Sequence, residues 1–273
     1  MPFIETNDKT TLFYNDWGTG RPVVLIHGWP VNSGMWEYQS VFLASQGLRA
    51  IAYDRRGFGR SSQPWTGYDY DTMADDLKAV MDKLELNDAT LVGFSMGGGE
   101  VARYMSRHNG ARVAKAVLVS AVTPYLLQTE NNPDGVGREV FDEIIEGLKN
   151  DRPNFLAGFG KKFFGAGMLN FTVTNEIQQW ALTMALTGSP KATLDCVRAF
   201  SETDFRRDMA AFKVPALVIH GDRDAIVPFE KSGQLTASMI PGARLEVYEG
   251  APHGLFFTEK DRLNQDLLAF IKG

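Results

Sequence analysis

A serine in a glycine-flanked turn is the residue of this sequence best suited to nucleophilic chemistry. Ser95 is the central residue of Gly93-Phe94-Ser95-Met96-Gly97, a G-x-S-x-G motif. A short apolar segment, Thr90 to Val92, precedes the motif, and a helical pattern begins near Met96. In this strand–turn–helix context the turn exposes the serine Oγ at a helix N-terminus, which favours developing negative charge. We therefore predict that Ser95 is a nucleophile.

A serine nucleophile needs a base, and the sequence has four histidines. His108 ends a helical segment, while His27 and His220 each end an apolar segment just before a glycine. Structural or surface roles are expected for these three. His253 lies in Ala251-Pro252-His253-Gly254, between the last apolar segment and the last helical one. A loop at that place can bring the imidazole over the nucleophile, so His253 is predicted to be the general base.

The acid that orients the imidazole should follow the apolar segment Ala216 to Ile219. Two carboxylates are available there, Asp222 and Asp224. Such an acid fixes the tautomer of the histidine and stabilises its positive form. Asp224 lies further into the loop and is favoured, whereas Asp222 beside Gly221 suits a turn. The residues alone leave both open.

An oxyanion hole needs two backbone N–H groups aimed at the developing charge. One is expected from Met96, directly after the nucleophile. The other is expected from the loop after the apolar segment Val23 to Ile26, so Trp29 in His27-Gly28-Trp29-Pro30 is the candidate. Pro30 restricts the backbone before it and should aim the Trp29 carbonyl, where it could accept a hydrogen bond from bound peroxide. The alternative is that Pro30 only stiffens the loop.

The elements that must position these groups alternate along the chain. Short runs rich in Val, Ile and Leu suit strands that are buried on both faces of a parallel sheet. Helical patterns lie between them, as expected of an α/β fold with a doubly wound sheet. The runs are Pro22–Ile26, Arg49–Asp54, Ala89–Gly93, Lys115–Ser120, Pro215–Ile219 and Leu245–Tyr248.

This alternation stops between about Val122 and Met209, where the pattern is mostly helical. We expect two parts: an α/β core of residues 1–121 and 210–273, and a helical cap of residues 122–209. A helical insertion late in a parallel sheet is typical of a lid over the carboxyl edge, where ligands bind. A helical layer packed for stability is the alternative. For a substrate pocket between the two parts we nominate Val122, Phe164, Phe200, Ile226 and Phe229, besides Pro30.

The composition is typical of a globular protein that does not bind nucleic acid or membranes. The chain has 273 residues, 44% of them hydrophobic, and a net charge of −5. Its scattered Lys and Arg residues argue against a nucleic-acid partner. The single cysteine, Cys196, lies in a helical pattern and reads as a small core residue, which fits a reducing compartment. With no run of membrane-span length and no signal-peptide pattern, we expect a soluble, cytoplasmic protein without a membrane partner.

Longer motifs carry a family resemblance over nearly the whole chain. They include His27-Gly28-Trp29-Pro30, the segment Asp54 to Ser61, Gly93 to Tyr104, Ser201 to Phe205, Gly221 to Asp224 and Ala251 to Gly254. On these motifs the sequence resembles the cofactor-free (non-haem) haloperoxidase, or perhydrolase/arylesterase, branch of the α/β hydrolases. The resemblance implies an α/β-hydrolase fold: a mostly parallel eight-stranded sheet, flanking helices and a helical lid. The order serine, acid, histidine is also that of this fold.

The resemblance also implies roles. It selects Asp224 over Asp222, giving Ser95, Asp224 and His253 as the triad with Trp29 and Met96 as oxyanion donors. It implies hydrolysis of small alkyl or aryl esters through an acyl-enzyme, without metal, haem or other cofactor. Hydrogen peroxide could serve as a co-substrate for perhydrolysis, and some relatives open a γ-lactam. A homo-oligomer, a trimer or hexamer, is implied by analogy.

Other functions stay open on the same residues. A carbon–carbon bond hydrolase or a γ-lactamase would use the same triad. A ligand-sensing protein could keep the fold with little turnover, although an intact triad argues against it. Epoxide hydrolases and dehalogenases of this fold use an aspartate nucleophile, so Ser95 disfavours them.

Overall fold

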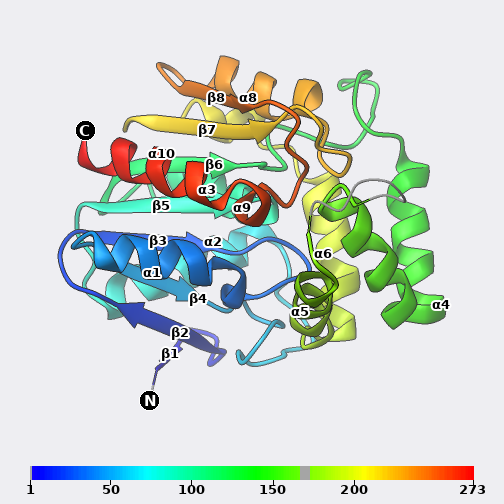
Figure 1. The fold of residues 1–273 in the computed structure, drawn as a ribbon, viewed down its shortest axis with the longest axis horizontal. Helices are drawn as coiled ribbons and strands as arrows, with labels where there is room; N and C mark the ends of the chain where they lie inside the picture. Colours follow the sequence, from blue (N-terminus) through cyan, green and yellow to red (C-terminus); the bar gives the residue numbers. More distant parts are fainter. Residues whose placement is uncertain (1, 167–172) are drawn as a thin grey trace.

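An eight-stranded sheet forms the centre of the computed structural model, which describes residues 2–166 and 173–273 (Figure 1). The strand order is β1-β2-β4-β3-β5-β6-β7-β8. Only β2 runs against its neighbours β1 and β4, and the other pairs are parallel. The predicted mostly parallel sheet is confirmed. The strands are β1 Phe3–Glu5, β2 Thr11–Trp17, β3 Pro22–Ile26, β4 Arg49–Tyr53, β5 Ala89–Phe94, β6 Val113–Val119, β7 Ala216–Gly221 and β8 Arg244–Tyr248.

The central strands are apolar throughout because helices cover both faces of the sheet. Successive residues of β3 point to opposite faces: Val24 joins one hydrophobic cluster, and Val23 and Leu25 join the other. The first cluster packs the sheet against α2 and α3, and the second packs it against α1 and α10. This explains the continuous apolar runs that indicated buried parallel strands.

Helices form a layer on each face of the sheet, and a further group lies at one edge. In Figure 1, α1 and α10 lie in front of the sheet, and α2 and α3 lie behind it. The helices are α1 Glu37–Ser45, α2 Tyr70–Lys83, α3 Met96–Arg107, α4 Arg138–Phe163, α5 Asn175–Leu186, α6 Pro190–Glu202, α7 Arg206–Met209, α8 Gly233–Met239, α9 Leu255–Thr258 and α10 Lys260–Lys272, with short 3-10 helices at Ser33–Trp36 and Phe229–Lys231.

The helices α4, α5 and α6 stand at the edge toward which the parallel strands point (Figure 1). The segment before them is not helical: residues 122–137 form a loop with a bridge between Leu127 and Val136. Helix α4 is kinked at Asp151, whose side chain accepts a hydrogen bond from the Asn154 N–H and begins a second helical half. Pro153 suits the first turn of that half. Of the expected helical segment, residues 167–172 lie outside the described residues.

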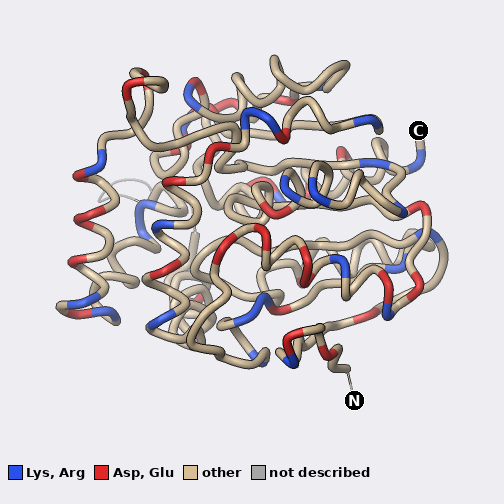
Figure 2. The backbone as a smooth tube through the Cα atoms, turned by 180° about the vertical axis from the view of Figure 1, so that it is seen from behind, with Lys and Arg blue, Asp and Glu red and all other residues tan. Residues whose placement is uncertain are grey.

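Charged residues of both signs are interspersed on the side of the molecule shown in Figure 2. Several of them pair across the outer helices; Arg107 on α3 donates to Asp75 on α2 at 2.8 Å. Among the described helices, none combines the length and the apolar character needed to cross a membrane.

Candidate active site

Ser95 occupies a sharp turn between β5 and α3. Its backbone has φ 53° and ψ −117°, a conformation that non-glycine residues rarely adopt and that neighbouring structure must hold. Space around the turn admits only glycine: a Cβ on Gly97 would lie 2.5 Å from the Ile26 carbonyl oxygen, and one on Gly93 would lie 2.4 Å from the Gly97 carbonyl oxygen. The glycines of the motif therefore allow the turn to pack against the end of β3.

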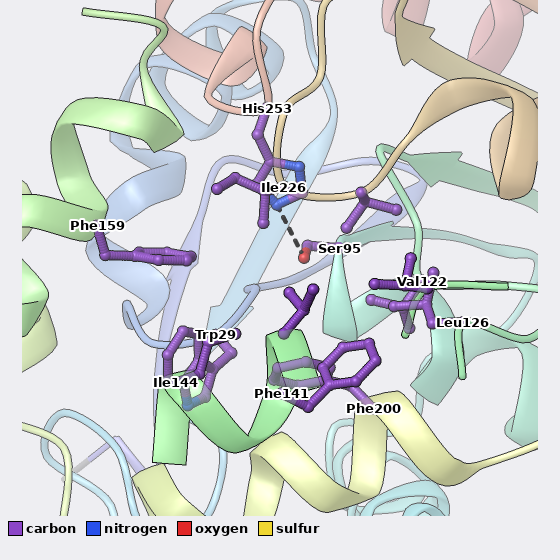
Figure 3. A pocket seen from close by; sticks show the side chains of 13 residues that line it. Trp29, Ser95, Val122, Leu126, Phe141, Ile144, Phe159, Phe200, Ile226 and His253 are labelled. Atoms are coloured by element: carbon purple, nitrogen blue, oxygen red, sulfur yellow. Dashed lines mark hydrogen bonds between the residues drawn. The ribbon is translucent and has the colours of Figure 1, made fainter. Parts of the chain in front are cut away.

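Three side chains from separate loops form one hydrogen-bonded chain. The Nε2 of His253, in the loop between β8 and α9, lies 3.0 Å from the Ser95 Oγ (Figure 3). The Nδ1 of the same ring lies 2.6 Å from the Oδ2 of Asp224, in the loop after β7. All three residues are buried. With Nδ1 protonated, Nε2 is free to accept the serine proton, which is the arrangement that activates a hydroxyl nucleophile.

Asp224 is surrounded by hydrogen-bond donors. Its Oδ1 accepts from the N–H groups of Ile226 at 2.9 Å and Val227 at 2.8 Å. Its Oδ2 lies 3.3 Å from the Nε2 of His220, besides its contact with His253. Burial alone would raise the pKa of Asp224, but the two imidazoles outweigh burial and lower its pKa well below the ordinary value. The carboxyl group is thus held ionised beside His253.

The other acid of this loop is oriented away from the imidazoles. Asp222 is exposed, and its Oδ1 accepts a hydrogen bond from the Gly250 N–H at 2.6 Å. It ties the loop after β7 to the loop after β8. This is the turn role that its place beside Gly221 suggested.

Two backbone N–H groups flank the serine. Met96 is the first residue of α3, so its N–H has no acceptor within the helix. The Trp29 N–H donates no hydrogen bond within residues 2–166 and 173–273. The loop that carries it abuts the nucleophile, since a Cβ on Gly28 would lie 3.0 Å from the Ser95 Cβ. Both groups are available to stabilise negative charge near the serine.

A small, mostly apolar cavity opens onto Ser95 and His253 (Figure 3). Of the residues nominated from the sequence, Val122, Phe200 and Ile226 line it, as does the Trp29 side chain. The remaining lining residues come chiefly from the loop before α4 and from α4 itself: Leu126, Val136, Val140, Phe141, Ile144, Phe159 and Val227.

Three nominated pocket residues lie outside this lining. The fully buried Phe164 packs behind the His253 loop, where a Cβ on Gly254 would lie 2.4 Å from its ring. Phe229 packs against the His220 ring, with centroids 5.8 Å apart. Pro30 lines a second, smaller cavity together with Phe159 and residues of α5. Whether such a residue lines the cavity depends on the direction of its side chain, and its place along the sequence does not reveal that direction.

Phe159 is the most informative residue that sequence reasoning missed. It lines the cavity at Ser95, the second cavity beside Pro30, and an outer hollow that also includes Phe155 and Ile226. Its ring meets Trp29 edge-on, with centroids 5.2 Å apart. A run of aromatics at helical spacing was visible in this segment, but such spacing is equally typical of a core helix.

Cys196 has no part in this site. It is fully buried in α6, and burial raises the pKa of its thiol to about 12. The thiolate that nucleophilic chemistry requires is therefore not populated near neutral pH.

Comparisons with known proteins agree with this fold. The sequence pattern of the alpha/beta hydrolase fold matches residues 21–260. A non-heme chloroperoxidase of Kitasatospora aureofaciens is 45% identical over 99% of both chains. A bifunctional esterase/perhydrolase of Acinetobacter calcoaceticus is 42% identical over the full length of both. The crystal structure of a bromoperoxidase from Bacillus anthracis superimposes with a TM-score of 0.96, at 48% identity and 99% coverage of each chain.

The chain belongs to the alpha/beta hydrolase family, in the branch that contains non-heme haloperoxidases and esterase/perhydrolases. The resemblance noted in the sequence motifs is thereby confirmed.

Proposed function

We propose that this protein is a serine esterase that hydrolyses small alkyl or aryl esters through an acyl-enzyme and also performs perhydrolysis. The observation that carries the proposal is the hydrogen-bonded chain from Ser95 through His253 to Asp224 at the wall of an apolar cavity. The esterase/perhydrolase relative supports both activities.

In acylation, His253 takes the proton of Ser95 as the Oγ attacks the acyl carbon. Negative charge that develops on the acyl oxygen is stabilised by the N–H groups of Trp29 and Met96. Asp224 holds the imidazole in the required tautomer and stabilises its positive form. The imidazolium then protonates the departing alcohol, and the acyl group stays on Ser95.

In deacylation, His253 takes a proton from water or hydrogen peroxide, whose oxygen attacks the acyl carbon. The Ser95 Oγ leaves and recovers the proton. Water releases a carboxylic acid, and peroxide releases a peracid, which can oxidise halide outside the site. Haloperoxidase activity is then a consequence of ester chemistry.

The cavity favours a small apolar acyl group. Aromatic rings of Phe141, Phe159 and Phe200 line it. Short acyl or aryl esters fit such a space better than long acyl chains.

An acyl-enzyme experiment tests this function. Rapid mixing with p-nitrophenyl acetate should give a burst of p-nitrophenol, and mass spectrometry of the quenched protein should find the acetyl group on the peptide that contains Ser95. Rapid turnover also separates an esterase from a ligand sensor. Turnover without an acyl group on Ser95 would contradict the proposal.

The proposal also covers the cap, the oligomeric state and the cellular setting of the protein. Residues 122–209 act as a cap over the core, supported by the cavity lining that α4 and α6 supply. Family analogy supports a homo-oligomer, a trimer or hexamer. A single buried cysteine fits a cytoplasmic, reducing setting.

A further inference from the structure

A buried polar network lies behind the candidate oxyanion hole. Its side chains, Glu100 on α3, Arg55 after β4 and His27 after β3, are all fully buried. The Arg55 Nε donates to the Glu100 Oε2 at 2.8 Å, and the Arg55 Nη2 donates to the His27 carbonyl oxygen at 2.8 Å. The hydroxyl of Tyr53 donates to the other oxygen of Glu100. The helix that begins at the nucleophile is thus linked to the oxyanion loop.

Within this network, the hydrogen bonds assign the tautomer of His27. The Arg55 backbone N–H donates to the His27 Nε2 at 2.9 Å, so Nε2 is an acceptor without a proton. The proton of the neutral ring is therefore on Nδ1, which donates to the Gly28 carbonyl oxygen at 2.8 Å. The Arg55 Nη1 lies further from Nδ1, at 3.4 Å, and donates no hydrogen bond to it. Burial, with Arg55 nearby, holds the pKa of His27 well below its ordinary value, so the ring stays neutral.

The carbonyl that His27 holds belongs to the same peptide unit as the Trp29 N–H. The cis peptide bonds of the described chain precede Pro30 and Pro124, so the Gly28–Trp29 bond is trans. In a planar trans peptide the C=O and the N–H point in opposite directions. Fixing the Gly28 oxygen on Nδ1 therefore fixes the direction of the Trp29 N–H.

We propose that His27 is a positioning residue for the oxyanion hole: it holds the Gly28 carbonyl and so aims the Trp29 N–H at the acyl oxygen. Arg55 and Glu100 hold His27 in turn and keep the oxyanion loop in register with the helix that carries Ser95. The inference rests on the proposed esterase function, because it assigns the Trp29 N–H as an oxyanion donor.

Two substitutions separate this role from simple support of the fold. In His27→Asn the amide nitrogen can take the place of Nδ1 and donate to Gly28. In His27→Gln the amide oxygen can take the place of Nε2 and accept from the Arg55 N–H, but no donor reaches Gly28. The matched control is His108→Asn, at the end of α3 and outside the network, where the partly buried ring lies beside Asp75.

Steady-state hydrolysis of p-nitrophenyl acetate is the measurement. We expect kcat to fall roughly 10- to 100-fold in His27→Gln with KM unchanged, which is part of the 10²- to 10³-fold loss on removing an oxyanion donor. His27→Asn should keep most of the wild-type kcat, and His108→Asn all of it. A folded Gln variant that matches or exceeds the Asn variant would overturn the proposal.

A measurement on the wild-type protein covers the case in which the variants fail to fold. In ¹⁵N NMR spectra of the histidine rings, His27 should show a protonated Nδ1 and an unprotonated Nε2 from pH 6 to 9. The opposite tautomer, or titration within this range, would overturn the proposal without reference to activity. Absence of hydrolysis that depends on Ser95 would instead overturn the esterase function itself.

Discussion

Replacing Asp224 by asparagine changes the triad in a way that the surrounding hydrogen bonds determine. Oδ1 accepts from the N–H groups of Ile226 and Val227, so the amide oxygen must take that position. The NH₂ group then replaces Oδ2 and faces His253 Nδ1 and His220 Nε2. His220 Nε2 carries a proton, because it donates to the Val227 carbonyl at 2.9 Å. The amide cannot flip, because its NH₂ group would then face the N–H groups of Ile226 and Val227, which can only donate. His220 keeps its proton on the Val227 carbonyl, and His253 must turn Nδ1 into an acceptor.

The size of the effect follows from this tautomer. With Nδ1 accepting from the amide, the His253 proton moves to Nε2, which can no longer accept the Ser95 proton. In trypsin-type serine hydrolases the same substitution lowers kcat about 10⁴-fold. At about 1.4 kcal/mol for each factor of ten, that is a loss of about 5 kcal/mol of transition-state stabilisation. We expect a similar loss here, with little change in KM.

The assay is hydrolysis of p-nitrophenyl acetate by wild type, Asp224→Asn and Asp222→Asn. Asp222 is the matched control, because an asparagine there can still accept from the Gly250 N–H. We expect it to retain near wild-type kcat. If Asp224→Asn kept more than about a tenth of the activity, or Asp222→Asn lost as much, the assignment of the acid and the tautomer argument would be refuted.

Three further predictions use the same cavity and loops. Phe159→Ala should raise kcat/KM for p-nitrophenyl butyrate relative to acetate by about 15-fold, since two methylene groups at about 0.8 kcal/mol each can enter the opened space. The control is Phe155→Ala, because Phe155 lines the outer hollow. An unchanged butyrate-to-acetate ratio in Phe159→Ala would contradict the role of Phe159 as a wall of the cavity. Pro30→Leu should lower the ratio of peracid formation to hydrolysis by releasing the Trp29 carbonyl, and an unaltered ratio would refute this role. The pKa of Asp224 is lowered in the folded state, so its charge increases the free energy of unfolding above about pH 4–5, and this contribution is lost at lower pH. The difference in unfolding free energy between wild type and Asp224→Asn, measured in urea, should therefore shrink on acidification. A difference that grows on acidification would contradict the lowered pKa.

Much of the site was predictable because its signals are local. The G-x-S-x-G motif lies between a strand and a helix, and the histidine loop lies between the last strand and the last helices. The strands meet at one sheet edge, so Ser95, Asp224 and His253 converge there. The choice between Asp222 and Asp224 could not be made from the residues alone. The choice depends on which carboxylate accepts hydrogen bonds from the N–H groups of Ile226 and Val227 and is thereby held toward His253.

The pocket was harder to predict because apolar residues on a helix look alike. Val122, Phe200 and Ile226 were named because they belong to the lid or to loops at the sheet edge. Phe141 and Phe159 also face the cavity, on the two halves of α4, whose axis is broken at Asp151. No periodicity reveals how such a kink orients the two halves.

Polar contacts between residues far apart along the chain could not be predicted from the sequence either. His27 ends an apolar segment, which indicated a structural role and nothing about its partners. Its hydrogen-bond partner Arg55 is 28 residues away along the chain, and Arg55 in turn pairs with Glu100, 45 residues further on. Such a network depends on the parallel pairing of β3 with β4 and on the packing of α3 against β3, which bring these positions together.

We propose that one serine, Ser95, performs both hydrolysis and perhydrolysis. The most direct test compares wild type and Ser95→Ala in two reactions: hydrolysis of p-nitrophenyl acetate, and peracid formation from acetate with hydrogen peroxide. We predict that wild type performs both reactions and that Ser95→Ala loses both together, while keeping the wild-type unfolding midpoint. Hydrolysis or peracid formation that survives in Ser95→Ala would contradict it.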